Sequence, residues 1–95
     1  MRLNRIAHAR SGDKGSNSNI GVIAYDKKGY DYLKEHLTSQ KVSKYFGVRA
    51  VRYELDNLMA LNFILFDILE GGASVSLQWD VQGKGFGQEI LEMEI

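Results

Sequence analysis

The chain has no cysteine, no excess of either charge and no long apolar run, and each absence excludes a class of protein. Without cysteine there can be no disulfide, no thiolate nucleophile and no cysteine-ligated metal centre. Twelve basic residues balance twelve acidic ones, so the formal net charge is zero. This balance argues against a nucleic-acid-binding protein, which would need bulk attraction to phosphate or aromatic side chains interleaved with basic ones.

Apolar residues are too dispersed for a membrane protein. Residues 1–6 lack the apolar run of a signal peptide. The longest apolar stretch, residues 59–69, is interrupted by Asn62 and Asp67 and is too short to cross a bilayer. We therefore expect a cytoplasmic protein with no membrane partner. At 95 residues, it should fold as a single domain over residues 1–95 around one modest core.

Hydrophobic periodicity predicts a mixture of strands and helices. Strands are expected at residues 3–10, 19–26, 49–56 and 74–81. Helices are expected at residues 29–37, 58–69 and 86–93, and a further helical piece should run from an N-cap at Thr38 to a stop at Gly47. Glycines at 71–72 and 83–85 mark turns. This order predicts fold class α+β: two layers, in which a sheet of about four strands, mainly antiparallel or mixed, has helices on one face.

The last two predicted strands alternate between apolar and polar residues, which is typical of a sheet with one dry face and one wet face. The dry face would hold the apolar residues: Val51, Tyr53, Leu55, Val75, Leu77, Trp79 and Val81. The wet face would hold the polar residues Arg52, Glu54, Ser76 and Gln78. It would also hold His8 and Arg10 if the even-numbered residues of the first strand point the same way. The simplest interpretation of the wet face is a solvated surface.

The predicted helix at residues 58–69 is apolar nearly all round, which is more than one sheet-facing stripe requires. Its excess surface would be covered either by neighbouring helices or by a second subunit, which would make the isolated chain a homo-oligomer. Asn62 lies inside this run, and its amide must find hydrogen-bond partners if it is buried. It could equally contact a ligand.

The most distinctive segment is residues 10–19, Arg-Ser-Gly-Asp-Lys-Gly-Ser-Asn-Ser-Asn. It matches neither a Walker A loop nor a dinucleotide-binding G-x-G-x-x-G motif. Backbone N–H groups freed by glycine, together with Lys14, could bind a small anion such as a phosphate or a carboxylate. Equally, serine, asparagine, aspartate and glycine are the usual turn formers, so the segment could be a structural loop between two strands.

No catalytic centre can be assigned from the side chains. His8, beside the polar segment, is a candidate acid or base, whereas His36 is expected to be solvated on its helix. Asp13 and Lys14 could form a catalytic pair, although adjacent loop residues need not face each other. The two histidines have no metal-ligand spacing, so we expect no metal ion and no cofactor. The sequence leaves open whether the protein is an enzyme.

Several segments, taken in order, resemble one family. The run Ala9-Arg10-Ser11-Gly12-Asp13-Lys14-Gly15, followed by Asn19-Ile20-Gly21-Val22-Ile23-Ala24, resembles the opening of the C-terminal domain of the acyclic-terpene-utilisation A (AtuA) family. Further similarities extend over nearly the whole chain: Tyr53-Glu54-Leu55, Ala60-Leu61-Asn62-Phe63, Asp67 before Gly71-Gly72, Ser76-Leu77 and Met93-Glu94-Ile95.

The resemblance implies a ferredoxin-like module in a setting of acyl-CoA breakdown, as in terpenoid and branched-chain acid catabolism. In the family this module usually follows a much larger domain, and it also resembles stand-alone small proteins that accompany a separate large partner. The resemblance favours a polar segment that binds a small anionic ligand, such as an acyl-CoA or a carboxylate. The residues expected to bind this ligand are Ser11, Gly12, Asp13, Lys14, Gly15, Asn17, Asn19 and Asn62. The alternative is a non-catalytic assembly module that forms an oligomer or a heteromer.

Overall fold

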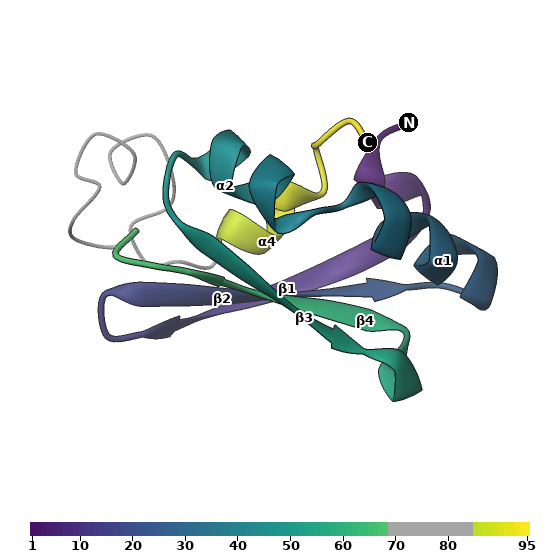
Figure 1. The fold of residues 1–95 in the computed structure, drawn as a ribbon, viewed down its shortest axis with the longest axis horizontal. Coiled ribbons are helices and arrows are strands. Elements are labelled where there is room, and N and C mark those ends of the chain that lie inside the picture. Colours follow the sequence, from purple (N-terminus) through teal and green to yellow (C-terminus); the bar gives the residue numbers. More distant parts are fainter. Residues whose placement is uncertain (69–84) are drawn as a thin grey trace.

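The computed structural model describes residues 1–68 and 85–95. Within this part, four strands form one antiparallel sheet in the order β1-β2-β4-β3. The strands are β1 (Ala7–Lys14), β2 (Asn17–Ala24), β3 (Ala50–Leu55) and β4 (Ala60–Leu65). The helices α1 (Lys27–His36), α2 (Ser39–Phe46) and α4 (Gly85–Ile90) lie on one side of the sheet (Figure 1). The predicted α+β architecture, an antiparallel sheet with helices on one face, is therefore confirmed.

Local capping residues fix where the first two helices begin and end. Asp26 precedes α1, and its Oδ1 accepts a hydrogen bond from the Gly29 backbone N–H at 2.7 Å. Thr38 precedes α2, and its Oγ1 accepts one from the Lys41 N–H at 3.1 Å. Gly47 ends α2 with φ 74°, a conformation that glycine adopts without steric penalty. The predicted cap at Thr38 and stop at Gly47 are confirmed.

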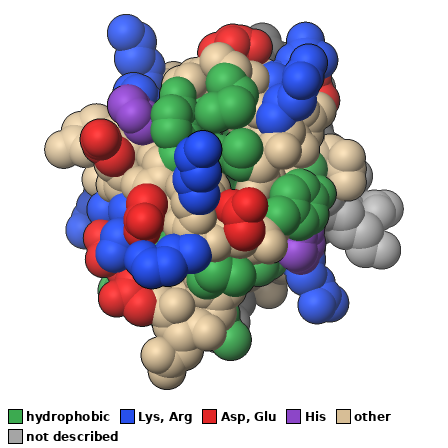
Figure 2. Space-filling view, turned by 90° about the vertical axis from the view of Figure 1, so that its right-hand side faces the viewer, with side chains coloured by type: hydrophobic (Ala, Val, Ile, Leu, Met, Phe, Trp, Pro, Cys, Tyr) green, Lys and Arg blue, Asp and Glu red, His purple; other side chains and the backbone are tan. Residues whose placement is uncertain are grey.

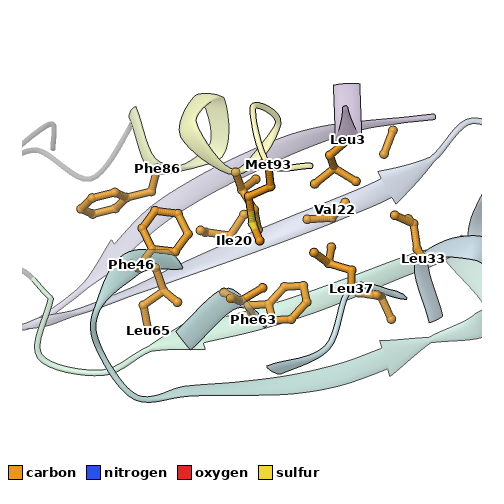
Figure 3. Close-up of a cluster of buried hydrophobic side chains, with 14 of the residues drawn as sticks. Leu3, Ile20, Val22, Leu33, Leu37, Phe46, Phe63, Leu65, Phe86 and Met93 are labelled. Carbon is orange, nitrogen blue, oxygen red and sulfur yellow. The ribbon is translucent and has the colours of Figure 1, made fainter. Parts of the chain in front are cut away.

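The hydrophobic core fills the space between the sheet and the helices (Figure 3). Burial alternates along β2, so every second side chain points into the core. Buried residues of β2 and β4 meet buried residues of the helices and their connections: Ile20, Val22, Leu61, Phe63 and Leu65 from the strands, and Tyr30, Leu33, Leu37, Val42, Phe46, Phe86 and Ile90 from the other side. The rings of Phe46 and Phe86 pack edge to face with centroids 5.9 Å apart, which joins α2 to α4.

The polar segment at residues 10–19 is not the loop that the sequence predicts. Its residues continue both strands, so only Gly15 and Ser16 lie in the turn between β1 and β2. Gly15 has φ 62°, and a two-residue turn of this kind matches the twist of the flanking strands. The first strand also begins later than predicted, because Leu3–Arg5 forms a short 3₁₀ helix, η1. Polar side chains do not prevent strand formation where a hairpin supplies the backbone hydrogen-bond partners.

Residues 58–69 contain a strand and not the predicted helix. β4 lies between β2 and β3, and a second 3₁₀ helix, η2 (Asp56–Leu58), joins it to β3. Periodicity alone does not distinguish a short apolar strand from a buried helix, and a central strand contacts neighbours on both edges. The argument for a homo-oligomer rested on the excess apolar surface of this helix, so that argument fails.

The two faces of β3 are the reverse of those predicted. Tyr53 and Leu55 are 52% and 42% exposed, whereas the Arg52 side chain is only 19% exposed and lies on the helix side. The Nη1 atom of Arg52 donates to the backbone oxygens of Lys34 and Leu37, at 3.0 and 2.9 Å. A cation is stabilised at the C-terminal end of a helix, and this contact with α1 outweighs the apolar alternation of the strand.

The two ends of the chain lie together on the helix side of the molecule. Arg2 and Glu94 form an isolated antiparallel bridge, and the Leu3 N–H donates to the Met93 oxygen at 2.9 Å. The predicted final helix is present but ends at Ile90. No helix within residues 1–68 or 85–95 is long and apolar enough to cross a membrane.

Several predictions fall on residues 69–84, which lie outside the described residues. They are the strand at residues 74–81, with Val75, Leu77, Trp79 and Val81 on its dry face and Ser76 and Gln78 on its wet face, and the glycine turns at 71–72 and 83–84.

Candidate functional site

No described element covers the side of the sheet opposite the helices (Figure 1), which we call the open face. Strand alternation and pairing register assign these residues to it: His8, Arg10, Gly12, Asn17, Asn19, Gly21, Ile23, Val51, Tyr53, Leu55, Ala60, Asn62 and Ile64. Among the predicted ligand-binding residues, Gly12, Asn17, Asn19 and Asn62 lie on this face. The side chain of Lys14 lies outside the described part of the structure.

Polar groups at the tip of the β1–β2 hairpin bind the end of β4. The Asn17 Oδ1 atom accepts a hydrogen bond from the Asp67 backbone N–H at 2.8 Å. The Ser16 hydroxyl donates to the Asp67 carboxylate at 3.2 Å. Asp67 itself has φ 58°, a left-handed conformation that aspartate tolerates better than most residues. These contacts fix the hairpin tip against a segment 50 residues away in the chain.

Two serines of the polar segment also form hydrogen bonds within the fold. The Ser11 Oγ atom accepts a hydrogen bond from the backbone N–H of Gly87 in α4, at 3.1 Å. The Ser18 hydroxyl donates to the Gly12 oxygen at 3.0 Å, across the hairpin. Ser11 therefore lies on the helix side of the sheet, as does Asp13, which pairs with Ser18 and is exposed. The structure does not bring Ser11 and Asp13 together with the amides of the open face.

Asn19 and Asn62 are brought into direct contact on the open face. The Asn19 Nδ2 atom donates to the Asn62 Oδ1 atom at 3.2 Å, between β2 and β4. Both side chains are partly exposed, and they are 43 positions apart in the chain. The pair leaves the Asn62 Nδ2 group as a donor that no other described residue engages. These two predicted site residues therefore form one polar element of the face.

Sequence reasoning missed the importance of Arg10 and Gly21. The register aligns Arg10 of β1, Gly21 of β2 and Asn62 of β4 in one row across three strands. Arg10 is exposed, and no described residue forms an ion pair with it. One signal was present in the sequence, since a glycine inside an apolar strand often marks a place where another group approaches the backbone.

The open face is basic although the chain as a whole is neutral. Among its described residues it has the side chains of His8 and Arg10 but no carboxylate. By contrast, acidic and basic side chains are interspersed at the end of the molecule where α1 begins (Figure 2). There Lys27 lies 3.4 Å from Asp31, and Lys34 lies 3.5 Å from Asp56. A basic face favours an acidic ligand or partner surface.

Arg10, Asn19 and Asn62 of the open face offer hydrogen-bonding groups to a ligand or a partner. Guanidinium and amide groups donate hydrogen bonds and do not ionise near neutral pH. His8, the sequence-predicted acid or base, is exposed and stacks on Tyr25 with ring centroids 5.5 Å apart.

The strongest electrostatic perturbation lies on the helix side, away from the open face. Burial raises the pKa of Tyr30 to about 12, helped by the hydrogen bond that its hydroxyl donates to the Asp56 carboxylate at 2.6 Å. That hydrogen bond, together with the charge of Lys34, lowers the pKa of Asp56. A phenol with a raised pKa stays protonated, so this cluster ties α1 to η2 and supplies no base.

The hollows found among residues 1–68 and 85–95 are lined by residues other than the predicted site residues. One of about 300 Å³ lies between the N-terminus and the start of α1, where Ile6, Tyr25 and Tyr32 line it. Within residues 1–68 and 85–95, no group of three histidine, aspartate or glutamate side chains is placed to hold a metal ion.

Comparison with known proteins gives one result. No curated protein and no solved structure matches the chain. The sequence does match the family described as the AtuA ferredoxin-like domain, and the match extends over residues 1–95. The four-stranded antiparallel sheet with helices on one face agrees with that description. The chain belongs to the AtuA ferredoxin-like domain family.

Proposed function

We propose that this protein is a non-catalytic docking module of an AtuA-like system and that its open face binds a larger AtuA-like protein. The observation that supports this most directly is the exposure of Tyr53 and Leu55, at 52% and 42%, on a sheet face that no described element covers. Tyrosine is enriched at protein interfaces because its ring buries a large area and its hydroxyl keeps a hydrogen bond.

The charge of the open face indicates which kind of partner surface would complement it. The open face has Arg10 and His8 and no carboxylate among its described residues, in a chain whose net charge is zero. A partner surface with acidic side chains around an apolar centre would complement it and would be attracted over several ångströms. Complementarity of this kind favours a specific heteromeric contact over self-association, because two copies of a basic face repel each other.

A ligand-binding hairpin tip is the weaker alternative. Four polar side chains of the hairpin already form hydrogen bonds within the fold: Ser11 with Gly87, Ser16 and Asn17 with Asp67, and Ser18 with Gly12. Binding an anion there would require some of these hydrogen bonds to be exchanged. The docking function uses instead the side chains that the fold leaves exposed. Acyl-CoA breakdown remains the metabolic setting that we propose, from the family resemblance.

The proposal covers two arrangements of the same module. The chain acts either as a stand-alone small subunit or as a domain linked behind a larger one, corresponding to the C-terminal domain of the family. Both arrangements place the open face against a large domain, so the same surface variants test both.

Co-purification with a candidate large AtuA-like protein, followed by titration calorimetry, tests the proposal. Tyr53→Ala is expected to weaken binding at least tenfold, because a central aromatic contact is lost. Leu58→Ala is the matched control, since Leu58 is 63% exposed but lies on η2, at the end of the sheet. Equal binding by the wild type and Tyr53→Ala, or an equal loss in both variants, would contradict docking through the open face.

A further inference from the structure

Two glycines of the open face have no evident role in the fold. Gly12 and Gly21 lie inside β1 and β2, and neither has a positive φ, so the backbone does not require glycine at either position. A Cβ atom on Gly12 would come no closer than 3.7 Å to a described atom, Asn19 Oδ1. A Cβ atom on Gly21 would come no closer than 4.0 Å.

Glycine inside a strand destabilises it relative to alanine, because it adds backbone entropy to the unfolded chain and packs no side chain. Where neither φ nor internal packing demands glycine, the remaining physical reason is an outside group that approaches the backbone closely. Gly12 and Gly21 are on adjacent strands and two residues apart in register, so they are diagonal neighbours that bring no side chain to the open face.

Polar groups stand on both sides of Gly21. Arg10 pairs with Gly21 on one side and Asn62 pairs with it on the other, so the Cα atoms of Arg10 and Asn62 lie about 10 Å apart, two strand spacings. No side chain rises between them. The Asn19 Nδ2 group holds the Asn62 Oδ1 atom at 3.2 Å, which leaves the Asn62 Nδ2 group to act as a donor.

One neighbour of Gly21 on this face is aliphatic. The Ile23 Cδ1 atom lies 4.0 Å from the position that a Gly21 Cβ atom would occupy, and Ile23 is partly exposed on the open face. Among the side chains that the structure describes, the surface around Gly21 therefore combines one guanidinium, one neutral amide donor and one aliphatic side chain. A single cation with neutral donors suits a planar monoanion, whereas phosphate groups are more often met by several cations.

We propose that the open face over Gly21 binds a short aliphatic carboxylic acid. The Arg10 guanidinium binds the carboxylate in a two-pronged contact, the Asn62 Nδ2 group donates to the same carboxylate, and the aliphatic chain lies against Ile23. The bare backbone of Gly12 and Gly21 lets the acid lie close to the sheet. This site goes beyond the docking function and is present on the chain alone; a bound acid would lie between the module and its partner.

Amide-resolved NMR titration of the full chain with isobutyrate tests the site without the partner. We expect saturable shifts at Gly12 and Gly21 and at the side-chain amides of Asn19 and Asn62, with a Kd of roughly millimolar order, as expected for few contacts. The neutral isostere isobutyramide should produce no such shifts. Arg10→Gln should weaken binding at least tenfold, and Arg5→Gln, which changes an exposed arginine outside the open face, should leave it unchanged.

Gly21→Ala is the decisive variant, because the added methyl group would make only ordinary van der Waals contacts, at 4.0 Å, and should leave the melting temperature unchanged or raised. It should nevertheless weaken isobutyrate binding at least tenfold. Wild-type affinity in Gly21→Ala, or equal shifts with phosphate and chloride, would overturn the site. Binding of a glutamyl peptide but not of isobutyrate would overturn the small-acid assignment. None of these results depends on whether a large partner docks.

Discussion

The contact between α4 and β1 provides a sharp test of how the sheet and helices fit together. Gly87 is buried in α4, and a Cβ atom there would lie 3.3 Å from the Ser11 Oγ atom and 3.4 Å from the backbone atoms Arg10 C and Ser11 N. The first distance is shorter than ordinary van der Waals contact, and the other two are at its lower limit. The substitution Gly87→Ala therefore requires α4 to move away from β1 by a few tenths of an ångström.

Two opposing effects decide the size of the change. Overpacking of a well-packed site costs about 1–3 kcal/mol. Replacing glycine by alanine within a helix contributes about 1 kcal/mol in the stabilising direction. Two of the three close contacts are backbone atoms of β1, which the antiparallel pairing with β2 holds in place, so the steric effect should win. We expect a net loss of about 1 kcal/mol in the free energy of unfolding, the difference between these two effects.

Thermal and urea denaturation of the full chain measure this loss, and a fall in Tm of about 4–8 °C corresponds to it for a domain of this size. Gln88→Ala, at an exposed position of the same helix, is the matched control and should be near neutral. Ser11→Ala removes the nearest atom, so the double variant should lose less stability than the sum of the two single losses. A Gly87→Ala protein as stable as the wild type would refute the close packing of α4 on β1.

Two further predictions concern the helix side of the sheet. Arg52→Met keeps most of the aliphatic stem but removes the guanidinium from the Lys34 and Leu37 oxygens, and should lower the free energy of unfolding by about 2 kcal/mol; an unchanged urea midpoint would contradict the capping of α1. The raised pKa of Tyr30 stabilises the fold fully below pH 10, and this contribution is lost as pH rises from about 10 towards about 12, because the unfolded phenol ionises first. Tyr30→Phe should remove this component of the alkaline loss, and an identical alkaline profile in the variant would disprove the assignment.

Three of the four predicted helical segments are present as α1, α2 and α4, and the signals that bound α1 and α2 are local. Asp26 and Thr38 hydrogen-bond to N–H groups three residues away, and Gly47 ends α2 by its own backbone conformation. Such contacts exist within one turn of chain and need no tertiary partner. The short apolar run at residues 19–26 likewise predicts a strand, and the structure places β2 there, between β1 and β4.

The errors concern elements whose state depends on distant neighbours. Residues 60–65 are a strand because β2 and β3 supply hydrogen-bond partners on both edges, and no local signal reports those partners. Arg52 faces the helices because the C-terminal end of α1 lies above it, which reverses the phase that Tyr53 and Leu55 suggest. In both cases a tertiary contact outweighs the local pattern.

For the candidate site, too, some features follow from the sequence alone and others only from the tertiary structure. By itself the sequence determined the chemical character of the parts: a polar segment at residues 10–19, an asparagine inside an apolar run, and a neutral chain without cysteine. Only the tertiary structure decided that Asn19 forms a hydrogen bond with Asn62, that Arg10 and Asn62 flank Gly21, and that Ser11 accepts a hydrogen bond from α4. Side-chain type is a property of each residue, but strand register joins residues more than 40 positions apart, and the whole sheet must form before that register exists.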